Sequence, residues 1–262
     1  MRRHSIITKA DVLRAVRILR WSTRFILVLY FGGRKRRVKA LEKILPAMER
    51  DGLLLGDWHR GEKVYSIPRK RRMKPVSMEH EIACALILVL FWRCRMEESE
   101  IVPERAFRGF EIVPEGGLRY AERRGTMLVF EYCTRSNFKH GGVMKSKITR
   151  YLKNLPKMET KFKRAVTVLF VIDVERDTVR EFVLRMNREF AGRGVLVADG
   201  MEERGVGSVA DASASPDGDR FPFDPFFFID FESLKSLPVG NALTANKFFW
   251  SDGSEWSLSK ND

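Results

Sequence analysis

The chain has 262 residues, 44% of them hydrophobic, and its 48 Lys+Arg outnumber its 34 Asp+Glu. This hydrophobic content is typical of a globular chain with a buried core. The positive charge is uneven, because residues 1–75 hold 21 basic and 6 acidic residues whereas residues 76–262 hold 27 and 28. A concentrated basic surface usually binds a polyanion, most often nucleic acid. The chain therefore divides into a basic N-terminal module and a nearly neutral C-terminal one.

Several classes of protein are excluded by what the sequence lacks. The longest apolar run, Ile82–Trp92, has 11 residues, whereas a membrane-spanning helix needs about 20. The N-terminus has no long apolar segment of the kind found in a signal peptide. Cys84, Cys94 and Cys133 are odd in number and widely spaced, which argues against both a disulfide framework and a zinc site. We expect a cytoplasmic protein in a reducing compartment with no membrane partner.

The N-terminal module shows three helical patterns followed by two short strands. Apolar spacing predicts a helix that contains Val12–Leu19, with Thr8 or Asp11 as its cap. The remaining predicted elements are a helix over Thr23–Phe31 capped by Ser22, a helix from Arg34 to Asp51 that Pro46 should kink or split, and strands at Leu53–Leu55 and Val64–Ile67 around a tip at His59–Glu62.

Three helices followed by a β-hairpin is the order of a winged helix-turn-helix, and we expect this fold over residues 1–75. In that fold the third helix enters the major groove of duplex DNA and the hairpin lies over the backbone. Basic residues concentrate on these elements. The predicted DNA-binding residues are Arg34, Lys35, Arg36, Arg37 and Lys39 on the third helix, Arg60 and Lys63 on the hairpin, and Arg69, Lys70, Arg71 and Arg72 after it.

The C-terminal module, residues 76–262, alternates helical and strand patterns, which predicts an α/β sandwich around a mixed sheet and an α+β chain overall. The predicted elements are helices over Met78–Arg95, Lys145–Leu155 and Thr178–Phe190, and strands over Phe107–Val113, Met127–Cys133, Ala165–Val174 and Gly194–Ala198. Residues 201–219 are small and polar, which predicts a mobile loop. The phenylalanine-rich segment from Phe221 to Phe231 favours a strand, and Phe248–Trp256 favours a terminal hairpin.

Two acidic residues stand out on this frame. Glu115 follows the strand predicted at Phe107–Val113, and Glu131 lies inside the hydrophobic strand predicted at Met127–Cys133. A carboxylate in a core strand is costly unless it is paired or bound to a cation. Acids on neighbouring strands favour a divalent metal site for phosphodiester hydrolysis, with Mg²⁺ or Mn²⁺ as the expected ion. The alternative is that Glu131 lies at the exposed end of its strand and is paired with Arg135 or Lys147.

The chain resembles the replication-relaxation proteins of plasmids and other mobile elements. The resemblance rests on the stretch GLLLGDWHRGEKVYSI, the helix that begins at Met78, the segment Val113-Pro114-Glu115-Gly116 with the strand around Glu131, a helix with Lys147 and Tyr151, and the terminal segment from Phe249 to Leu258. It implies an N-terminal winged helix and a restriction-endonuclease-like domain similar to the PD-(D/E)XK nucleases.

The resemblance also implies site residues for that second domain. Glu115, Glu131 and Lys147 would be catalytic, and Glu81, Glu115 and Glu131 would hold the metal. The lysine that the nuclease superfamily has two residues after the strand acid would fall at Cys133, and a thiol cannot polarise a phosphate as an ammonium does. Lys145 or Lys147 would then take its place. The sequence leaves open whether the domain is an endonuclease or a nuclease-like fold retained for binding.

Three functions compete at this stage. The first is a DNA-binding protein of a plasmid, phage or other mobile element that acts in replication initiation or its control, with double-stranded DNA and replication proteins as partners. The second is a metal-dependent endonuclease or nickase. The third is a non-catalytic transcriptional regulator whose second domain forms a homodimer or recruits a partner. We favour the first because the charge is localised on the predicted winged helix.

Overall fold

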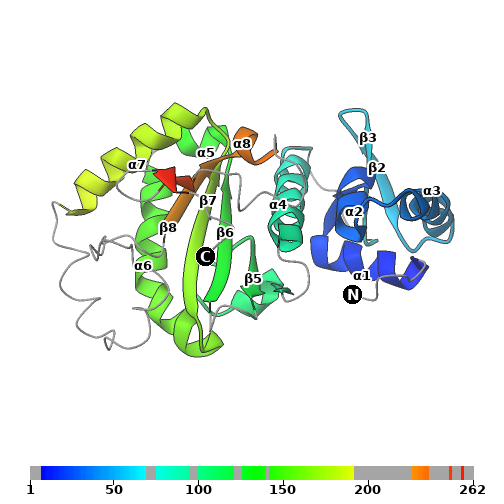
Figure 1. Cartoon of the computed structure of the whole chain (residues 1–262), viewed down its shortest axis with the longest axis horizontal. Coiled ribbons are helices and arrows are strands. Elements are labelled where there is room, and N and C mark those ends of the chain that lie inside the picture. The colour runs from blue at the N-terminus through cyan, green and yellow to red at the C-terminus, as the bar shows by residue number, and fades with distance from the viewer. Residues whose placement is uncertain are drawn as a thin grey trace. The chain divides into compact units, whose positions relative to one another are not determined.

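The computed structural model describes residues 7–68, 75–94, 99–120, 126–139, 142–191, 226–235, 248–249 and 255–256. The chain is an α+β protein with two compact units, Met1–Glu97 and Glu98–Asp262 (Figure 1). The division follows the long apolar helix that the sequence places after residue 75, so this helix belongs to the first unit. The basic segment 69–72, the predicted strand 194–198 and the predicted loop 201–219 lie outside the described residues.

The first unit contains four helices and a three-stranded antiparallel sheet among its described residues. In chain order these are α1 (Lys9–Leu19), β1 (Trp21–Thr23), α2 (Arg24–Phe31), α3 (Lys35–Arg50), β2 (Leu55–His59), β3 (Glu62–Ser66) and α4 (Pro75–Cys94). The strands are ordered β1-β3-β2, so the short first strand joins the far edge of the hairpin. No described helix, α4 included, is long and apolar enough to cross a membrane.

Local sequence signals explain where the first helices begin. Thr8 caps α1, and its hydroxyl and the Asp11 carboxylate accept hydrogen bonds from each other's backbone amides, which forms a capping box. Thr23 caps α2, accepting from the Ile26 amide at 3.3 Å. The prediction of Ser22 as this cap was wrong by one residue, because Trp21–Thr23 pair with β3 as a strand before the helix starts.

Two further expectations for the first unit change in detail. Pro46 does not split α3, which runs without interruption from Lys35 to Arg50. A proline removes one backbone hydrogen-bond donor from a helix. Because Pro46 is exposed, it does not disturb the buried side of α3 that contains Leu45 and Met48. The hairpin strands lie nearer the tip than predicted, since β2 and β3 flank a two-residue turn, Arg60–Gly61, in which both residues have positive φ.

The second unit is built on one mixed sheet. Its described elements are β4 (Ser99–Val102), η1 (Glu104–Phe107), β5 (Gly116–Tyr120), β6 (Thr126–Cys133), α5 (Arg135–Lys139), α6 (Gly142–Phe162), β7 (Ala165–Ile172), α7 (Arg176–Ala191), β8 (Phe226–Asp230), α8 (Phe231–Lys235), β9 (Phe248–Phe249) and β10 (Glu255–Trp256). The strand order is β10-β9-β8-β7-β6-β5-β4. Strands β6, β7 and β8 are parallel, and the flanking pairs are antiparallel.

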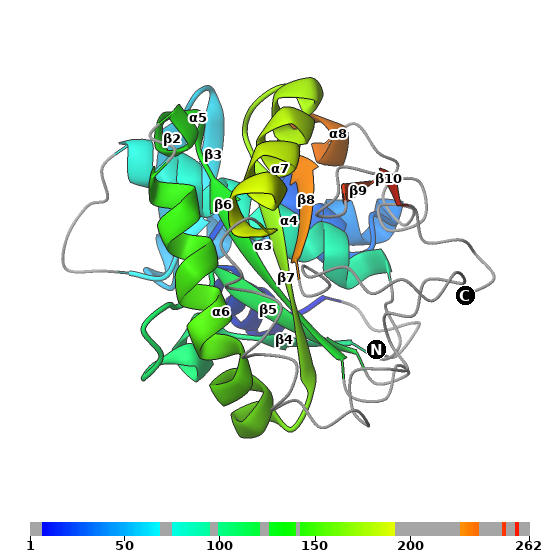
Figure 2. The ribbon, with the colours of Figure 1, turned by 90° about the vertical axis from the view of Figure 1, so that its left-hand side faces the viewer.

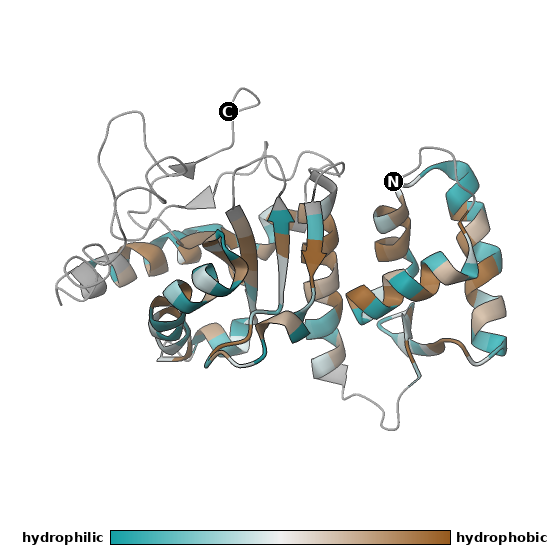
Figure 3. Ribbon diagram, turned by 90° about the horizontal axis from the view of Figure 1, so that it is seen from below, coloured by the Kyte–Doolittle hydropathy of each residue, from teal (hydrophilic) through white to brown (hydrophobic). Residues whose placement is uncertain are grey.

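The main core lies between one face of this sheet and helices α6 and α7, which cover the sheet side by side (Figure 2). Alternate residues of β6, β7 and β8 point into this core, including Val129, Phe170 and Phe228. The helices present the complementary apolar sides, and Figure 3 shows hydrophilic and hydrophobic residues alternating along them. Because side chains alternate along a strand, Glu131 points to the same face as Val129 and therefore towards α6.

The strand predicted over Phe107–Val113 was wrong. The chain there forms the 3-10 turn η1 and an irregular segment in which Gly109 has φ +97°. The strand begins instead at Gly116, where the sequence suggested a turn. A Cβ at Gly116 would lie 2.7 Å from the Phe130 ring, so this glycine permits close packing between neighbouring strands. The strand at Met127–Cys133 is confirmed as part of β6, and Ala165–Ile172 as β7.

Candidate functional site

Helix α3 carries an exposed basic face on the first unit. Leu41, Leu45 and Met48 are buried on one side of the helix. The exposed positions at helical spacing on the other side are Arg36, Lys39, Lys43 and Arg50, with Arg34 and Lys35 exposed at its start. Residues three, four or seven apart lie on one face of a helix, so these cations form one stripe. The stripe is an electrostatic surface suited to phosphates.

The carboxylates of α3 are neutralised within the unit. Glu42 forms an ion pair with Arg24 of α2 at 3.0 Å, and Glu49 pairs with Lys63 of β3 at 2.7 Å. Among the described residues, the ion pairs of the chain involve none of the four cations of the stripe. The positive charge of the stripe is therefore available to a ligand.

Several predicted DNA-binding residues have partners in the protein. Arg37 is half-buried, and its guanidinium donates to the Phe31 carbonyl at the end of α2. On the hairpin, Arg60 pairs with Glu79 and Lys63 pairs with Glu49. Arg60 nevertheless remains 78% exposed in its side chain. The predicted DNA-binding residues thus fall into two groups. Those that belong to the stripe on α3 form no ion pair among the described residues. In contrast, Arg37, Arg60 and Lys63 each contact another group of the protein.

Three exposed residues near this face were not predicted from the sequence. Lys43 and Arg50 continue the stripe and could have been found by extending the helical spacing from Lys39. Trp58 on β2 is 72% exposed, and the Lys63 ammonium lies 5.9 Å from the centre of its ring. Its position in a hairpin strand gave no signal, because aromatic residues in strands are most often buried.

A second site forms around Glu131 in the second unit. The pairing of Gly116 with Phe130 places Glu115 beside Glu131 across the β5–β6 ladder, and the Glu115 amide donates to the Phe130 carbonyl at 3.1 Å. Lys147 and Tyr151, one turn apart on α6, both reach the Glu131 carboxylate. The structure therefore brings together the three predicted catalytic residues, Glu115, Glu131 and Lys147.

Glu131 is 1% exposed, so the alternative that it lies at an exposed strand end is wrong, and each oxygen of its carboxylate has a donor. Oε2 accepts from the Lys147 ammonium, and Oε1 accepts from the Tyr151 hydroxyl at 2.6 Å. Tyr151 is fully buried, whereas the Lys147 side chain is 25% exposed. The arrangement satisfies the requirement that a buried charge be paired and hydrogen-bonded.

Burial and mutual charge shift the titration of these groups. Burial raises the pKa of Glu131 above its ordinary value, although Lys147 and Tyr151 favour its ionised form. For Lys147 burial opposes the charged form, but the Glu131 carboxylate outweighs it and raises the pKa. Burial, with the nearby Glu131 charge, raises the pKa of Tyr151 well above its ordinary value. The Glu131 carboxylate is thus stabilised in the protein interior by the Lys147 ammonium and the Tyr151 hydroxyl.

This arrangement does not fit a divalent metal. Mg²⁺ prefers six oxygen ligands and retains several waters, whereas Glu131 is buried with its charge already balanced by Lys147. A metal would have to displace that ammonium. Burial raises the pKa of Cys133, which stands at the expected lysine position, to about 11, so its thiol is no anionic ligand near neutral pH. Glu81 lies in the first unit, where it pairs with Arg20 at 2.5 Å.

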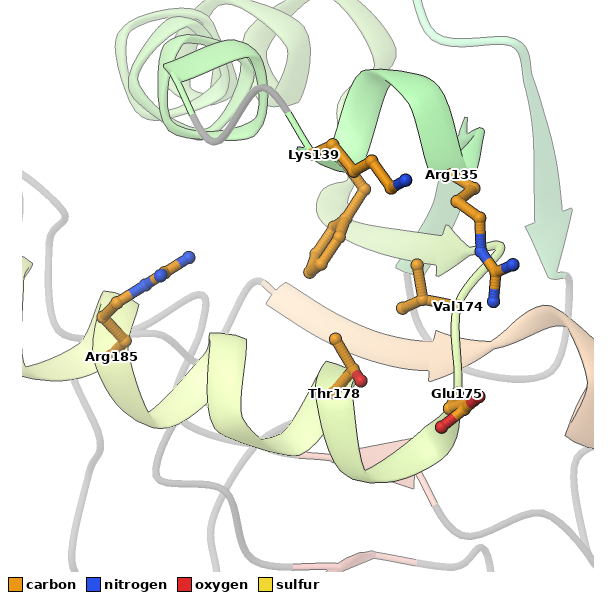
Figure 4. A pocket seen from close by; sticks show the side chains of 7 residues that line it. Arg135, Lys139, Val174, Glu175, Thr178 and Arg185 are labelled. Atoms are coloured by element: carbon orange, nitrogen blue, oxygen red, sulfur yellow. The ribbon is translucent and has the colours of Figure 1, made fainter.

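A surface groove of about 480 Å³ lies between α5 and α7 in the second unit. Arg135 and Lys139 reach it from α5, and Arg185 from α7, with Glu175 and Thr178 along the α7 side (Figure 4). Phe138 forms part of its apolar wall and packs edge-on against Phe182. The residues that line the groove therefore include three cations and one acid, beside the apolar Phe138 and Val174.

No family model matches this chain, and neither a curated protein nor a solved structure matches it significantly.

Proposed function

We propose that the chain is a DNA-binding protein whose N-terminal unit is a winged helix-turn-helix. The order α1-β1-α2-α3-β2-β3 and the pairing of β1 with the hairpin support this fold. The three-residue turn between α2 and α3 contains Gly32 and Gly33, both with positive φ, which lets the chain reverse direction between the two helices. In this proposal α3 is the helix that enters the major groove and β2–β3 is the wing.

The observation that carries the proposal is the open basic stripe of Arg36, Lys39, Lys43 and Arg50 on α3. The neutralisation of Glu42 and Glu49 by neighbouring cations leaves this face with one sign of charge. Contacts from such a face to phosphates supply affinity and salt dependence, whereas base edges supply specificity. With about eight phosphates neutralised, the plot of log K against log salt should have a slope near −7.

For the C-terminal unit we propose a restriction-endonuclease-like scaffold. Its support is the placement of Glu115 immediately before β5, of Glu131 on the neighbouring strand β6 and of Lys147 on α6, which agrees with what the resemblance to replication-relaxation proteins implies. The balanced charge of Glu131 favours a scaffold used for binding and assembly. Together the two units suit a protein of a plasmid, phage or other mobile element that acts in replication initiation or its control.

The test of the proposed function is duplex binding measured by fluorescence anisotropy over a salt series. Each lost phosphate contact lowers the magnitude of the log–log slope by about 0.9. The variant Lys39→Gln/Lys43→Gln should therefore show a slope smaller by about 2 and, at 0.15 M salt, affinity weaker by about 30-fold. Wild-type protein that fails to bind duplex DNA, or binds it without salt dependence, would overturn the proposal.

The matched control removes two positive charges from another helix. Arg180 and Arg188 are exposed on α7, where the exposed acids Asp177 and Glu181 alternate with them. The variant Arg180→Gln/Arg188→Gln should bind as the wild type does. An equal loss in this control would mean that net charge, and not the α3 face, determines binding.

The alternative function is a metal-dependent nuclease, which is favoured by the proximity of Glu115, Glu131 and Lys147. Its test is incubation with supercoiled plasmid with and without Mn²⁺, beside Glu131→Gln. Metal-dependent nicking that disappears in the variant would support the nuclease. A band shift without nicking supports the DNA-binding scaffold.

A further inference from the structure

The C-terminal module contains a second basic segment, although its total charge is close to zero. Residues 135–164 hold 10 Lys+Arg and 1 Asp+Glu, and residues 201–262 hold 5 and 11. The two segments offset each other in the sum over residues 76–262. The structure places the basic segment on α5 and α6 and on the turn after them, so the charge is concentrated on the surface of one part of the unit.

Helix α6 has two distinct sides. Met144, Ile148, Tyr151, Leu155 and Met158 are buried against the sheet. Arg150, Lys153 and Lys157 are exposed on the other side. Their spacing of three and four residues puts them on one face, and the same spacing relates Arg36, Lys39 and Lys43 on α3.

The acidic residue of α6 does not neutralise this face. Glu159 accepts from the Val166 amide at 3.2 Å, so its carboxylate is turned towards β7. Lys161, at the end of the helix, donates to the Ala106 carbonyl at 2.9 Å and lies 4.9 Å from the Phe110 ring centre. Within the described part of the chain, the ion pairs leave Arg150, Lys153 and Lys157 unused.

We propose that the outer face of α6, formed by Arg150, Lys153 and Lys157, is a second contact surface for the backbone of duplex DNA. From Arg150 to Lys157 the face extends about 10 Å at 1.5 Å per residue, which is about the axial length of three base pairs. The ammonium groups of lysine and the guanidinium groups of arginine bind phosphates well, and such contacts do not distinguish one base sequence from another. The inference rests on the proposed DNA-binding function and extends it to the second unit.

The charge pattern selects a polyanion over an apolar partner. The exposed side chains of this face are Val143 at the start of the helix and then Ser146, Arg150, Lys153, Pro156, Lys157, Thr160 and Lys161. A stable protein–protein interface needs an apolar or aromatic centre, and this face has none. The same partner that the α3 stripe recruits can therefore bind here by charge alone.

The test compares Lys153→Gln/Lys157→Gln with Lys39→Gln/Lys43→Gln, because both pairs are lysines four residues apart on an exposed helix face. Binding of the full chain to a 40-bp duplex is measured by anisotropy over a salt series. The α6 variant is expected to lose about 30-fold in affinity at 0.15 M salt and to reduce the slope by about 2. Arg180→Gln/Arg188→Gln serves as the charge-matched control, and thermal unfolding by circular dichroism verifies that each variant is folded.

The outcomes separate the two proposals. An α6 variant that binds as the wild type, beside an impaired α3 variant, overturns the second surface and leaves the proposed function standing. Absence of duplex binding by the wild type overturns both. Equal loss in all three variants overturns the second surface as well, because the effect would then follow net charge and not position.

Discussion

Replacing Lys147 with methionine isolates the energetic role of the buried ion pair. The substitution keeps an unbranched side chain but removes the ammonium from Glu131, which is 1% exposed. Breaking a buried pair by removing one partner costs about 3–5 kcal/mol, because an uncompensated charge remains. Against a typical domain stability of about 5–15 kcal/mol, that loss is large. We expect Lys147→Met to lower the free energy of unfolding by this amount at pH 8.

The cost should depend on pH in a defined direction. Burial already raises the pKa of Glu131, and loss of the cation raises it further. A group whose pKa is higher in the folded than in the unfolded state stabilises the fold below the unfolded pKa and loses that contribution as the pH rises through the folded pKa. Below the unfolded pKa of about 4.3 the carboxyl is protonated in both states, so at pH 4 most of the destabilisation should disappear.

Urea unfolding followed by circular dichroism at pH 4 and pH 8 measures this difference. Glu131→Gln/Lys147→Met removes both charges and should recover much of the stability at pH 8, because no buried charge is left unpaired. Lys153→Met on the same helix is the control, and an exposed substitution should cost less than about 0.5 kcal/mol. Equal destabilisation by Lys147→Met at both pH values would refute the reasoning, since packing alone would then explain the loss.

Three further predictions concern other parts of the chain. Thr8→Ala removes the capping box with Asp11 and should cost about 1 kcal/mol in urea unfolding; an unchanged midpoint would mean that the cap contributes nothing. Gly116→Ala places a Cβ 2.7 Å from the Phe130 ring and should cost about 1–3 kcal/mol by the same measurement. Because burial raises the pKa of Cys133 to about 11, iodoacetamide at pH 8 should label it only in unfolded protein, as peptide mass mapping would detect.

The helices and the central strands could be predicted from the sequence because their apolar residues follow a single period. The pattern of Val12, Val16 and Leu19 reports one buried face of α1, and the continuous apolar run of β7 reports a buried strand. Such patterns arise from burial alone and need no knowledge of distant contacts. The expected order of elements in the first unit therefore agreed with the structure except for the short strand β1 and for α4, which the sequence analysis assigned to the C-terminal module.

The errors occurred where tertiary contacts decide the local structure. Gly116 and Gly117 suggested a turn, but they belong to a strand because the Phe130 and Phe107 rings pack closely over them. Gly109, with φ +97°, interrupts the apolar segment that suggested a strand. The sequence does not show whether a glycine is needed for a positive φ or for close packing against a neighbouring side chain. Hydrophobic periodicity therefore cannot distinguish these two roles.

The candidate site was predicted in part. The cost of a carboxylate in a core strand identified Glu131, and the sequence left its partner open between Arg135 and Lys147, of which the structure shows Lys147. The contribution of Tyr151 to the same carboxylate depends on how α6 packs on β6, which no local pattern encodes. The open face of α6 was missed because its charge is cancelled in the total by acidic residues far along the chain.

The placement of Glu131 also constrains how the sheet can assemble. Sliding β6 by one residue along β7 would exchange the two faces of the strand. Glu131 would then leave Lys147 and Tyr151, and an apolar neighbour would take its place opposite two polar groups of α6. A one-residue slip would thus take the carboxylate away from both of its donors, a penalty that apolar side chains alone could not impose. The Glu131 carboxylate therefore favours the observed register of β6 on β7 over a one-residue slip.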